Sequence, residues 1–218
     1  SGCTDSYPPL SALSGAHGPS RSVGSGLALA ALLSFAGCGS GSAPTYSVRF
    51  DALTVPPGRE STQCVLKRLQ NPSALHASQI RSTLGPGTHH VILYTSSETE
   101  ERPTPFDCKP FSNLLNSQQG VPLLIAQSSD DALQLPPGVG IPLAPQQMVR
   151  IEMHYINAST SPIEVSAAAT FTELPAGELR DEAGLAFFSN SAIDLPPAST
   201  RSLGPLFLPV PSELAGVK

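Results

Sequence analysis

A chain of 218 residues, of which only 13% are charged and 6% aromatic, has room for one large β domain or one and a half smaller ones. Its 23 prolines and 18 glycines are widely spread, which suits many short strands joined by turns rather than long helices. The net charge of −5 argues against a nucleic-acid partner, because no basic stripe exists to neutralise phosphates. No apolar run reaches the roughly 18–20 residues of a transmembrane helix.

The first forty residues predict export. Residues 1–20 are small, polar and proline-rich, and we expect them to be disordered or to be sequence upstream of a misplaced start. Residues 21–38 carry one cation, then an apolar run, then Ala-Gly-Cys, a pattern typical of a signal peptide. The ending resembles a bacterial lipobox, which would make Cys38 a lipid-anchored N-terminus in the periplasm or cell envelope, followed by a flexible linker at 39–44. Ordinary secretion and a buried helix are the alternatives.

Export also bears on the four cysteines of the chain. When Cys3 and Cys38 are set aside, Cys64 and Cys108 remain, and an oxidising compartment favours a disulfide between them over a metal site. Such a bond would close a loop of about 44 residues and stabilise the fold by a few kcal/mol. Two free thiols are the alternative.

Strands separated by turn residues are predicted along the rest of the chain. The expected strands lie at 46–55, 60–69, 89–94, 121–127, 148–157, 163–174, 183–189 and 203–210. We expect residues 96–119 to be mostly loop and 134–143 to be a turn-rich ribbon. His76 is expected in a polar loop, solvated or locally hydrogen-bonded.

Two of the five histidines, His89 and His90, stand side by side between a Gly-Pro-Gly turn and an apolar strand. Neutral imidazole is the commonest side-chain ligand for metals such as copper and zinc. Successive residues of an ideal strand point to opposite faces, so both can bind one metal only if the strand start is twisted or bulged. Two surface histidines are the alternative.

His154 offers a third ligand on the strand predicted at 148–157. One face of that strand is apolar and comprises Val149, Ile151, Met153 and Tyr155. His154 lies on the opposite face with Arg150 and Glu152 and points away from the apolar set. Taken alone, the position also suits a solvent-exposed histidine.

Four segments occur in one order: PPGRESTQC at 56–64, GTHHVILY at 87–94, LPPGVGIPL at 135–143 and MVRIEMHYIN at 148–157. Together they resemble the copper type II, ascorbate-dependent monooxygenases, the family of dopamine β-monooxygenase and peptidylglycine α-hydroxylating monooxygenase, and especially its bacterial members. The resemblance covers about residues 45–218. It implies an all-β architecture.

In that architecture an antiparallel, jelly-roll-like β-sandwich copper domain at 45–175 precedes the first strands of a second, incomplete sandwich at 176–218. A weak repeat between residues 50–58 and 191–198 also indicates two related β domains.

The resemblance also implies a site. In the family, one copper of the N-terminal domain is held by an adjacent histidine pair and a later histidine, which correspond to His89, His90 and His154 here. A family disulfide corresponds to Cys64 and Cys108, whereas the other family cysteines of that domain are absent. This copper receives electrons from ascorbate, and a second copper, on a His-x-His pair and a methionine, activates oxygen. No His-x-His occurs in this sequence, so no catalytic residue is assigned.

We therefore expect the one-copper, electron-transfer domain of an exported monooxygenase that hydroxylates a C–H bond of a small molecule or peptide with O2. The chain by itself, a fragment or truncated product, is expected to be inactive. The alternatives are a non-catalytic copper-binding or electron-transfer lipoprotein of the cell envelope, and an adhesive β-sandwich with incidental histidines. A zinc hydrolase with Glu152 as general base is a further alternative. The membrane would be contacted only through the lipid anchor.

Overall fold

The computed structural model describes residues 42–109, 120–185 and 194–202. The chain divides into two compact units, 1–40 and 41–218, and every described residue belongs to the second unit. The predicted signal peptide with Cys38, the strand predicted at 203–210 and residues 186–189 lie outside the described residues. In the part of the chain that is described, no helix meets the length and hydropathy that a membrane crossing requires.

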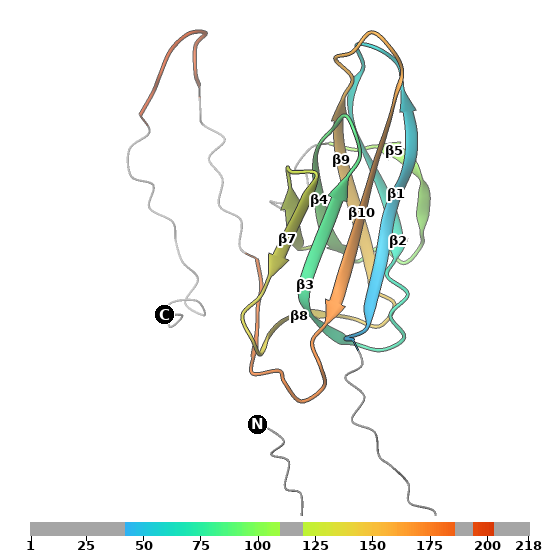
Figure 1. Cartoon of the computed structure of the whole chain (residues 1–218), viewed down its shortest axis with the longest axis vertical. Coiled ribbons are helices and arrows are strands. Elements are labelled where there is room, and N and C mark those ends of the chain that lie inside the picture. The colour runs from blue at the N-terminus through green and yellow to red at the C-terminus, as the bar shows by residue number, and fades with distance from the viewer. Residues whose placement is uncertain (1–41, 110–119, 186–193, 203–218) are drawn as a thin grey trace, which may run out of the picture. The chain divides into compact units, whose positions relative to one another are not determined.

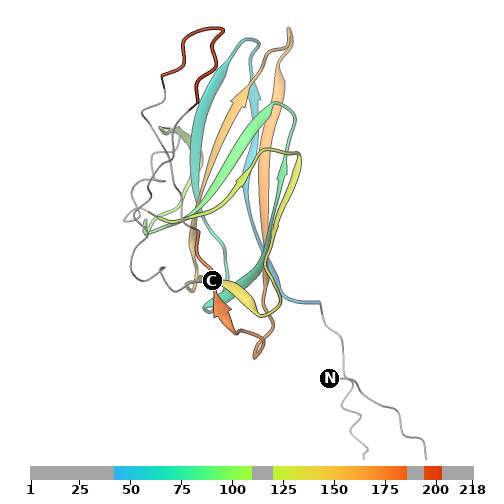
Figure 2. The ribbon, with the colours of Figure 1, turned by 90° about the vertical axis from the view of Figure 1, so that its left-hand side faces the viewer.

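The described strands form two sheets, and the predicted all-β, antiparallel β-sandwich is confirmed (Figures 1 and 2). In spatial order the six-stranded sheet contains β1 (Thr45–Val55), β10 (Ile163–Glu173), β3 (Leu75–Leu84), β8 (Val139–Leu143) and β11 (Asp181–Glu182), with β7 (Asp130–Gln134) also paired to β3. The five-stranded sheet has the order β5 (Arg102–Asp107), β2 (Glu60–Arg68), β9 (Met148–Ile156), β4 (Thr88–Ser96) and β6 (Pro122–Ala126). All neighbours pair antiparallel except β8 and β11, which are parallel.

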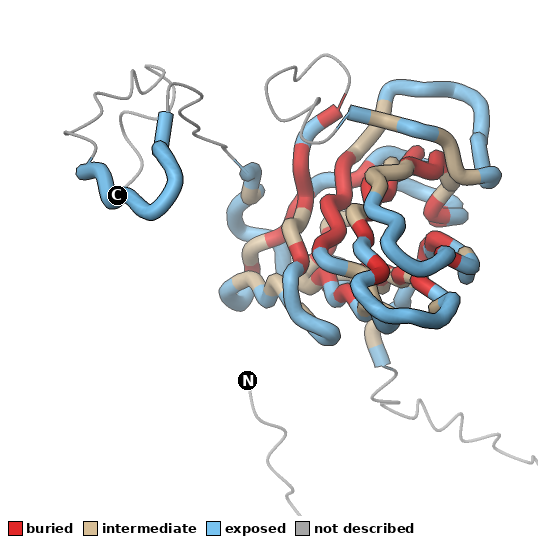
Figure 3. The backbone as a smooth tube through the Cα atoms, turned by 90° about the horizontal axis from the view of Figure 1, so that it is seen from above, coloured by how far each residue is buried: buried red, intermediate tan, exposed pale blue. Residues whose placement is uncertain are grey.

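The core lies between the sheets and follows the two-residue period of the strands. The predicted apolar face of β9 is buried in this core: its residues Val149, Ile151, Met153 and Tyr155 are at most 5% exposed. They pack in one cluster with side chains of the other sheet, including Ala167, Ala169 and Phe171 of β10. Figure 3 shows buried stretches of backbone gathered in the middle of the fold, with exposed segments around them. Burial of each large apolar side chain is worth about 1.5–3 kcal/mol, so this cluster fixes which face of β9 turns outward.

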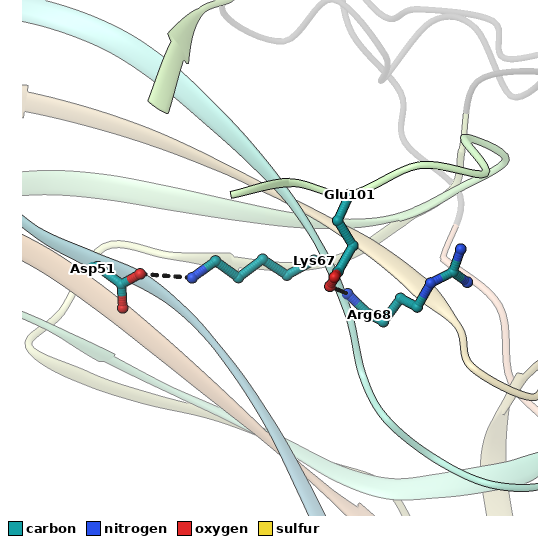
Figure 4. Close-up of polar contacts among 4 residues, drawn as sticks. All are labelled: Asp51, Lys67, Arg68 and Glu101. Atoms are coloured by element: carbon teal, nitrogen blue, oxygen red, sulfur yellow. Dashed lines mark hydrogen bonds and ion pairs between the residues drawn. The ribbon is translucent and has the colours of Figure 1, made fainter. Parts of the chain in front are cut away.

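One polar contact joins the two sheets, and a second holds the segment before β5 to β2 (Figure 4). The ammonium group of Lys67 on β2 lies 2.7 Å from a carboxylate oxygen of Asp51 on β1. Next to it, the backbone N–H of Arg68 donates to the carboxylate of Glu101, which precedes β5, over 2.7 Å. Asp51 is mostly exposed, so its ion pair contributes at most about 1 kcal/mol and serves chiefly to set the position of the strands.

Two predicted loops contain strands. Within 96–119, residues Arg102–Asp107 form β5. Its prolines, Pro103 and Pro105, interrupt the alternation by which a strand is recognised in the sequence. Proline is tolerated there because β5 is an edge strand. His76 belongs to β3 rather than to a loop, because Leu75, Ala77 and Ile80 face the core. The ribbon predicted at 134–143 contains the end of β7 and all of β8.

The segment after Pro175 begins by adding to the same sandwich. Asp181 and Glu182 pair with Val139 and Gly140 of β8, and the backbone N–H of Ala183 donates to the carbonyl of Gly140 over 2.9 Å. Residues 183–185 of the strand predicted at 183–189 are not in a strand. A second domain beginning near residue 176 stays a prediction.

Candidate metal centre

The turn before the histidines requires its glycines. Gly87 has a φ of 73°, in the left-handed region, and a side chain there would meet the Ile163 side chain. A Cβ on Gly85 would stand 2.5 Å from Oγ of Ser166, and the Gly85 backbone N–H donates to the Ser166 carbonyl over 2.8 Å. The turn therefore packs directly on β10 and fixes where β4 begins.

The irregular strand start that a shared metal would require is present at the beginning of β4. Thr88 of β4 is the Cα partner of Tyr155 on β9, and His90 is the partner of His154. Between these two pairs, β4 advances by two residues but β9 by only one. His89 is thus the extra residue of a β-bulge, where two residues oppose one. A bulge breaks the strict alternation of side chains, so the adjacent histidines can serve one site.

The three predicted ligands come together. The ring centroids of His89, His90 and His154 are 4.9–5.4 Å apart, with each pair of rings steeply inclined. One ring nitrogen from each residue lies within 4.8 Å of the others, and Nδ1 of His89 is 3.2 Å from Nδ1 of His90. Metal–nitrogen bonds of about 2.0–2.1 Å place two ligand nitrogens at most about 4.2 Å apart, so this pair already has a suitable spacing.

Burial prepares one of these ligands for metal binding. His90 is 7% exposed, and burial, with the imidazoles of His154 and His89 adding to it, lowers the pKa of His90 below the usual 6.5. The neutral ring that results keeps a lone pair available for a metal. His89 is exposed and His154 is partly exposed, so the group is open to solvent on one side. These features fit a copper or zinc ion held by three imidazoles with an open position.

A carboxylate that the sequence did not single out supports His154. Oε1 of Glu60, at the first position of β2, lies 3.0 Å from Nε2 of His154. When Nε2–H donates to this carboxylate, Nδ1 carries the lone pair that can bind a metal. The hydrogen bond also fixes the orientation of the His154 ring. Glu60 could not be found from spacing, because 94 residues separate it from His154 and only the pairing of β2 with β9 brings them together.

Glu152, the carboxylate considered as a general base, occupies a different position. It lies on the face of β9 that carries His154, as predicted, but it is fully buried. Its Oε2 accepts a hydrogen bond from the Tyr94 hydroxyl over 3.2 Å and lies 3.6 Å from Nη2 of Arg150. Burial, and next the charge of Glu152, raise the pKa of Tyr94, so the phenol stays a donor. Glu152 is thus buried and held by Tyr94 and Arg150, which does not suit a general base that must reach a metal-bound water in a zinc hydrolase.

The predicted disulfide between Cys64 and Cys108 is confirmed, with a Cα–Cα separation of 5.8 Å. It joins β2 to the residue that follows β5. Sγ of both cysteines lies near the Glu152 carboxylate, but sulfurs joined to each other are not thiolate ligands. Of the two metal-ligand groups in the described residues, that of the three histidines is therefore the one whose donor atoms are not joined in a disulfide.

No protein-family model matches the chain, and a search of curated proteins found no match either. The case for a function therefore rests on the sequence motifs and on the geometry described above.

Proposed function

We propose that the chain binds one copper ion on His89, His90 and His154 and serves as the electron-transfer domain of an exported copper-dependent monooxygenase. The observation that carries this proposal is the convergence of the three imidazoles from a bulged strand start and its neighbour. These residues are also the ones that the resemblance to the copper type II monooxygenases implies. Neutral nitrogen donors hold copper in both of its oxidation states, which favours copper over zinc for this role.

Each surrounding residue has a part in that role. When bound, copper would exchange single electrons with ascorbate or a similar reductant. His90 contributes a buried neutral ring, and Glu60 orients the ring of His154. His89 leaves the group open to small molecules from solvent. The disulfide and the bulge hold the strands so that the three ligands keep their positions when the charge of the site changes.

Hydroxylation of a C–H bond with O2 would need a second, oxygen-activating copper. No His-x-His is present in this sequence, so we propose that the chain by itself transfers electrons without hydroxylating a substrate. In the whole enzyme the substrate would be a small molecule or a peptide. A lipid anchor on Cys38 would hold the protein at the cell envelope.

A second candidate is a non-catalytic copper-binding or electron-transfer lipoprotein. It is favoured by the single histidine group among the described residues, which is open to solvent at His89. The coding sequence beyond Lys218 discriminates between the two: a downstream His-x-His with a methionine supports the monooxygenase, and a stop codon supports the binding protein.

The test is calorimetric titration of the purified chain with copper, combined with electron paramagnetic resonance. We expect one tightly bound Cu(II) per chain with a spectrum of nitrogen ligands. In His154→Ala we expect the affinity to fall by about 100-fold or more, because a three-ligand site loses one ligand.

The matched control is His76→Ala, which removes a histidine outside the group and leaves binding unchanged. Circular dichroism confirms that each variant is folded. If His154→Ala binds copper with unchanged affinity, the three-histidine site is wrong. If the unmodified chain clearly prefers zinc to copper in a competition titration, the electron-transfer role is wrong.

A further inference from the structure

A separate cavity of about 780 Å³ lies where the β8–β11 edge of the six-stranded sheet meets β6, the edge strand of the other sheet. Its lining is mostly apolar, and core residues reach it, among them Leu75, Leu123, Ile141 and Leu143. Pockets of this size and character bind small organic molecules. These four side chains are only 2–7% exposed, so each presents a small part of its surface to the cavity.

The cavity is distinct from the histidine centre. It is lined by Thr95 and Ser96, at the end of β4, whereas His89 and His90 lie at the start of that strand. A strand rises about 3.4 Å per residue, so the five residues from His90 to Thr95 span about 17 Å. A ligand in the cavity would not touch the proposed copper ligands.

One polar pair, His76 and Glu182, lies in the lining of the cavity. Nε2 of His76 on β3 lies 2.8 Å from Oε1 of Glu182 on β11, 106 residues further along the chain. The pairing of β11 with β8 brings Glu182 here, and glycine at 140 lets β8 pass His76, since a Cβ there would stand 2.6 Å from the His76 Cβ.

The pair gives the cavity a negative character. Glu182 is the one acidic side chain in the described lining, and no lysine or arginine lines it. The carboxylate can accept further hydrogen bonds, because it has two oxygens and about four acceptor positions.

We propose that this cavity binds a small apolar amine, with its ammonium group at Glu182 and its alkyl or aryl body against Leu75, Leu123 and Leu143. The negative charge selects a cationic head group, and the apolar wall selects an uncharged body. An apolar carboxylic acid is disfavoured, because its charge would face the Glu182 carboxylate and the described lining holds no lysine or arginine. The proposal is independent of copper binding.

The test uses three probes of equal chain length: hexylamine, hexanol and hexanoate. Binding to the full chain is followed by methyl NMR. We expect saturable shifts of the Leu75, Leu123 and Leu143 methyl signals, no shift of the His89 and His90 ring signals, and the highest affinity for hexylamine.

The head group is tested with Glu182→Gln, which keeps the shape and the hydrogen-bond acceptor but removes the charge. Affinity for hexylamine should fall by about tenfold while affinity for hexanol stays the same. Glu178→Gln, an exposed carboxylate on the preceding turn that does not line the cavity, is the matched control and should bind all three probes as the unmodified chain does.

Three outcomes overturn the proposal: no saturable methyl shift with hexylamine at about 10 mM, hexanoate or hexanol binding as tightly as hexylamine, or Glu182→Gln binding hexylamine with unchanged affinity.

Discussion

The outer faces of the two sheets both carry polar side chains, but these side chains differ in their access to solvent. On the six-stranded sheet, Arg81 and Asp130 form an ion pair in which both side chains are about half exposed. Ser47 bonds to Thr170 on the same exposed face. On the five-stranded sheet, by contrast, the outward-facing Tyr94 and Glu152 are fully buried.

Successive pairs across β4 and β9 show what this buried face contains. The Cα partners are His90 with His154, Ile92 with Glu152, and Tyr94 with Arg150. A buried polar group must find a partner within the protein, whereas an exposed one can exchange its partner for water. The histidines thus lie at the end of a row whose geometry is fixed by its own contacts. That is where a site needing constant ligand positions can be built.

Removing the Cys64–Cys108 disulfide beside this row should have the largest effect on the free energy of unfolding. Cys64→Ala combined with Cys108→Ala opens a loop with a sequence separation of 44 and should lower the free energy of unfolding by about 4 kcal/mol. Urea denaturation monitored by circular dichroism measures the change. The reduced unmodified chain is the control and should be destabilised by a similar amount. A loss below about 1 kcal/mol would mean that other contacts already hold β5 on the sheet.

The next effect compares the two faces directly. Glu152→Gln removes the charge beside Arg150, whose side chain is 11% exposed, and should lower the free energy of unfolding by about 3 kcal/mol. On the solvated face, Asp130→Asn breaks the exposed pair with Arg81 and should lower the free energy of unfolding far less than Glu152→Gln does. Urea denaturation of both variants measures the two changes. Equal losses in the free energy of unfolding would refute the contrast between the faces.

Local patterns predicted part of this arrangement. Alternation along residues 148–157 predicted the inner and outer faces of β9, including the position of His154, whereas a twisted or bulged strand start was only the condition for His89 and His90 to share a metal. The short edge strand β5, with its prolines, has no such alternation and was missed. Glu60 and Glu182 were missed for another reason: their partners are 94 and 106 residues away, and no local pattern reports which strands become neighbours.

Replacing Glu60 should have a smaller effect than these changes, and the effect should be on metal affinity rather than on the free energy of unfolding. If the proposed copper site is correct, Glu60→Ala removes the acceptor of His154 Nε2–H and should weaken copper binding by about 10-fold to 100-fold. Glu60→Gln keeps an acceptor without the charge and should fall between Glu60→Ala and the unmodified chain. Competition titration measures affinity, and the paramagnetic resonance spectrum reports ligand orientation.

The matched control for Glu60 is Glu164→Ala, an exposed carboxylate on β10 that should leave both readouts unchanged. If Glu60→Ala and Glu164→Ala behave alike, the orienting role of Glu60 is wrong, while the three-histidine site still stands on the His154→Ala result.

The smallest expected effect is a pH dependence that only the buried face should show. In the metal-free chain the folded pKa of His90 is lowered, chiefly by burial, whereas the unfolded value is near 6.5. Between these two values the unfolded chain binds more protons, so stability is complete above about pH 6.5 and is lost as pH falls toward the folded pKa.

Urea midpoints measured from about pH 8 to about pH 5 should therefore decline in the unmodified chain and decline less in His90→Gln. His89→Gln is the matched control: it removes the exposed neighbour, keeps His90 buried and should retain most of the decline. Equal slopes in all three proteins would mean that His90 is as free to take up a proton as a histidine in solvent. The contrast between a fixed and a solvated polar face would then not extend to the histidines themselves.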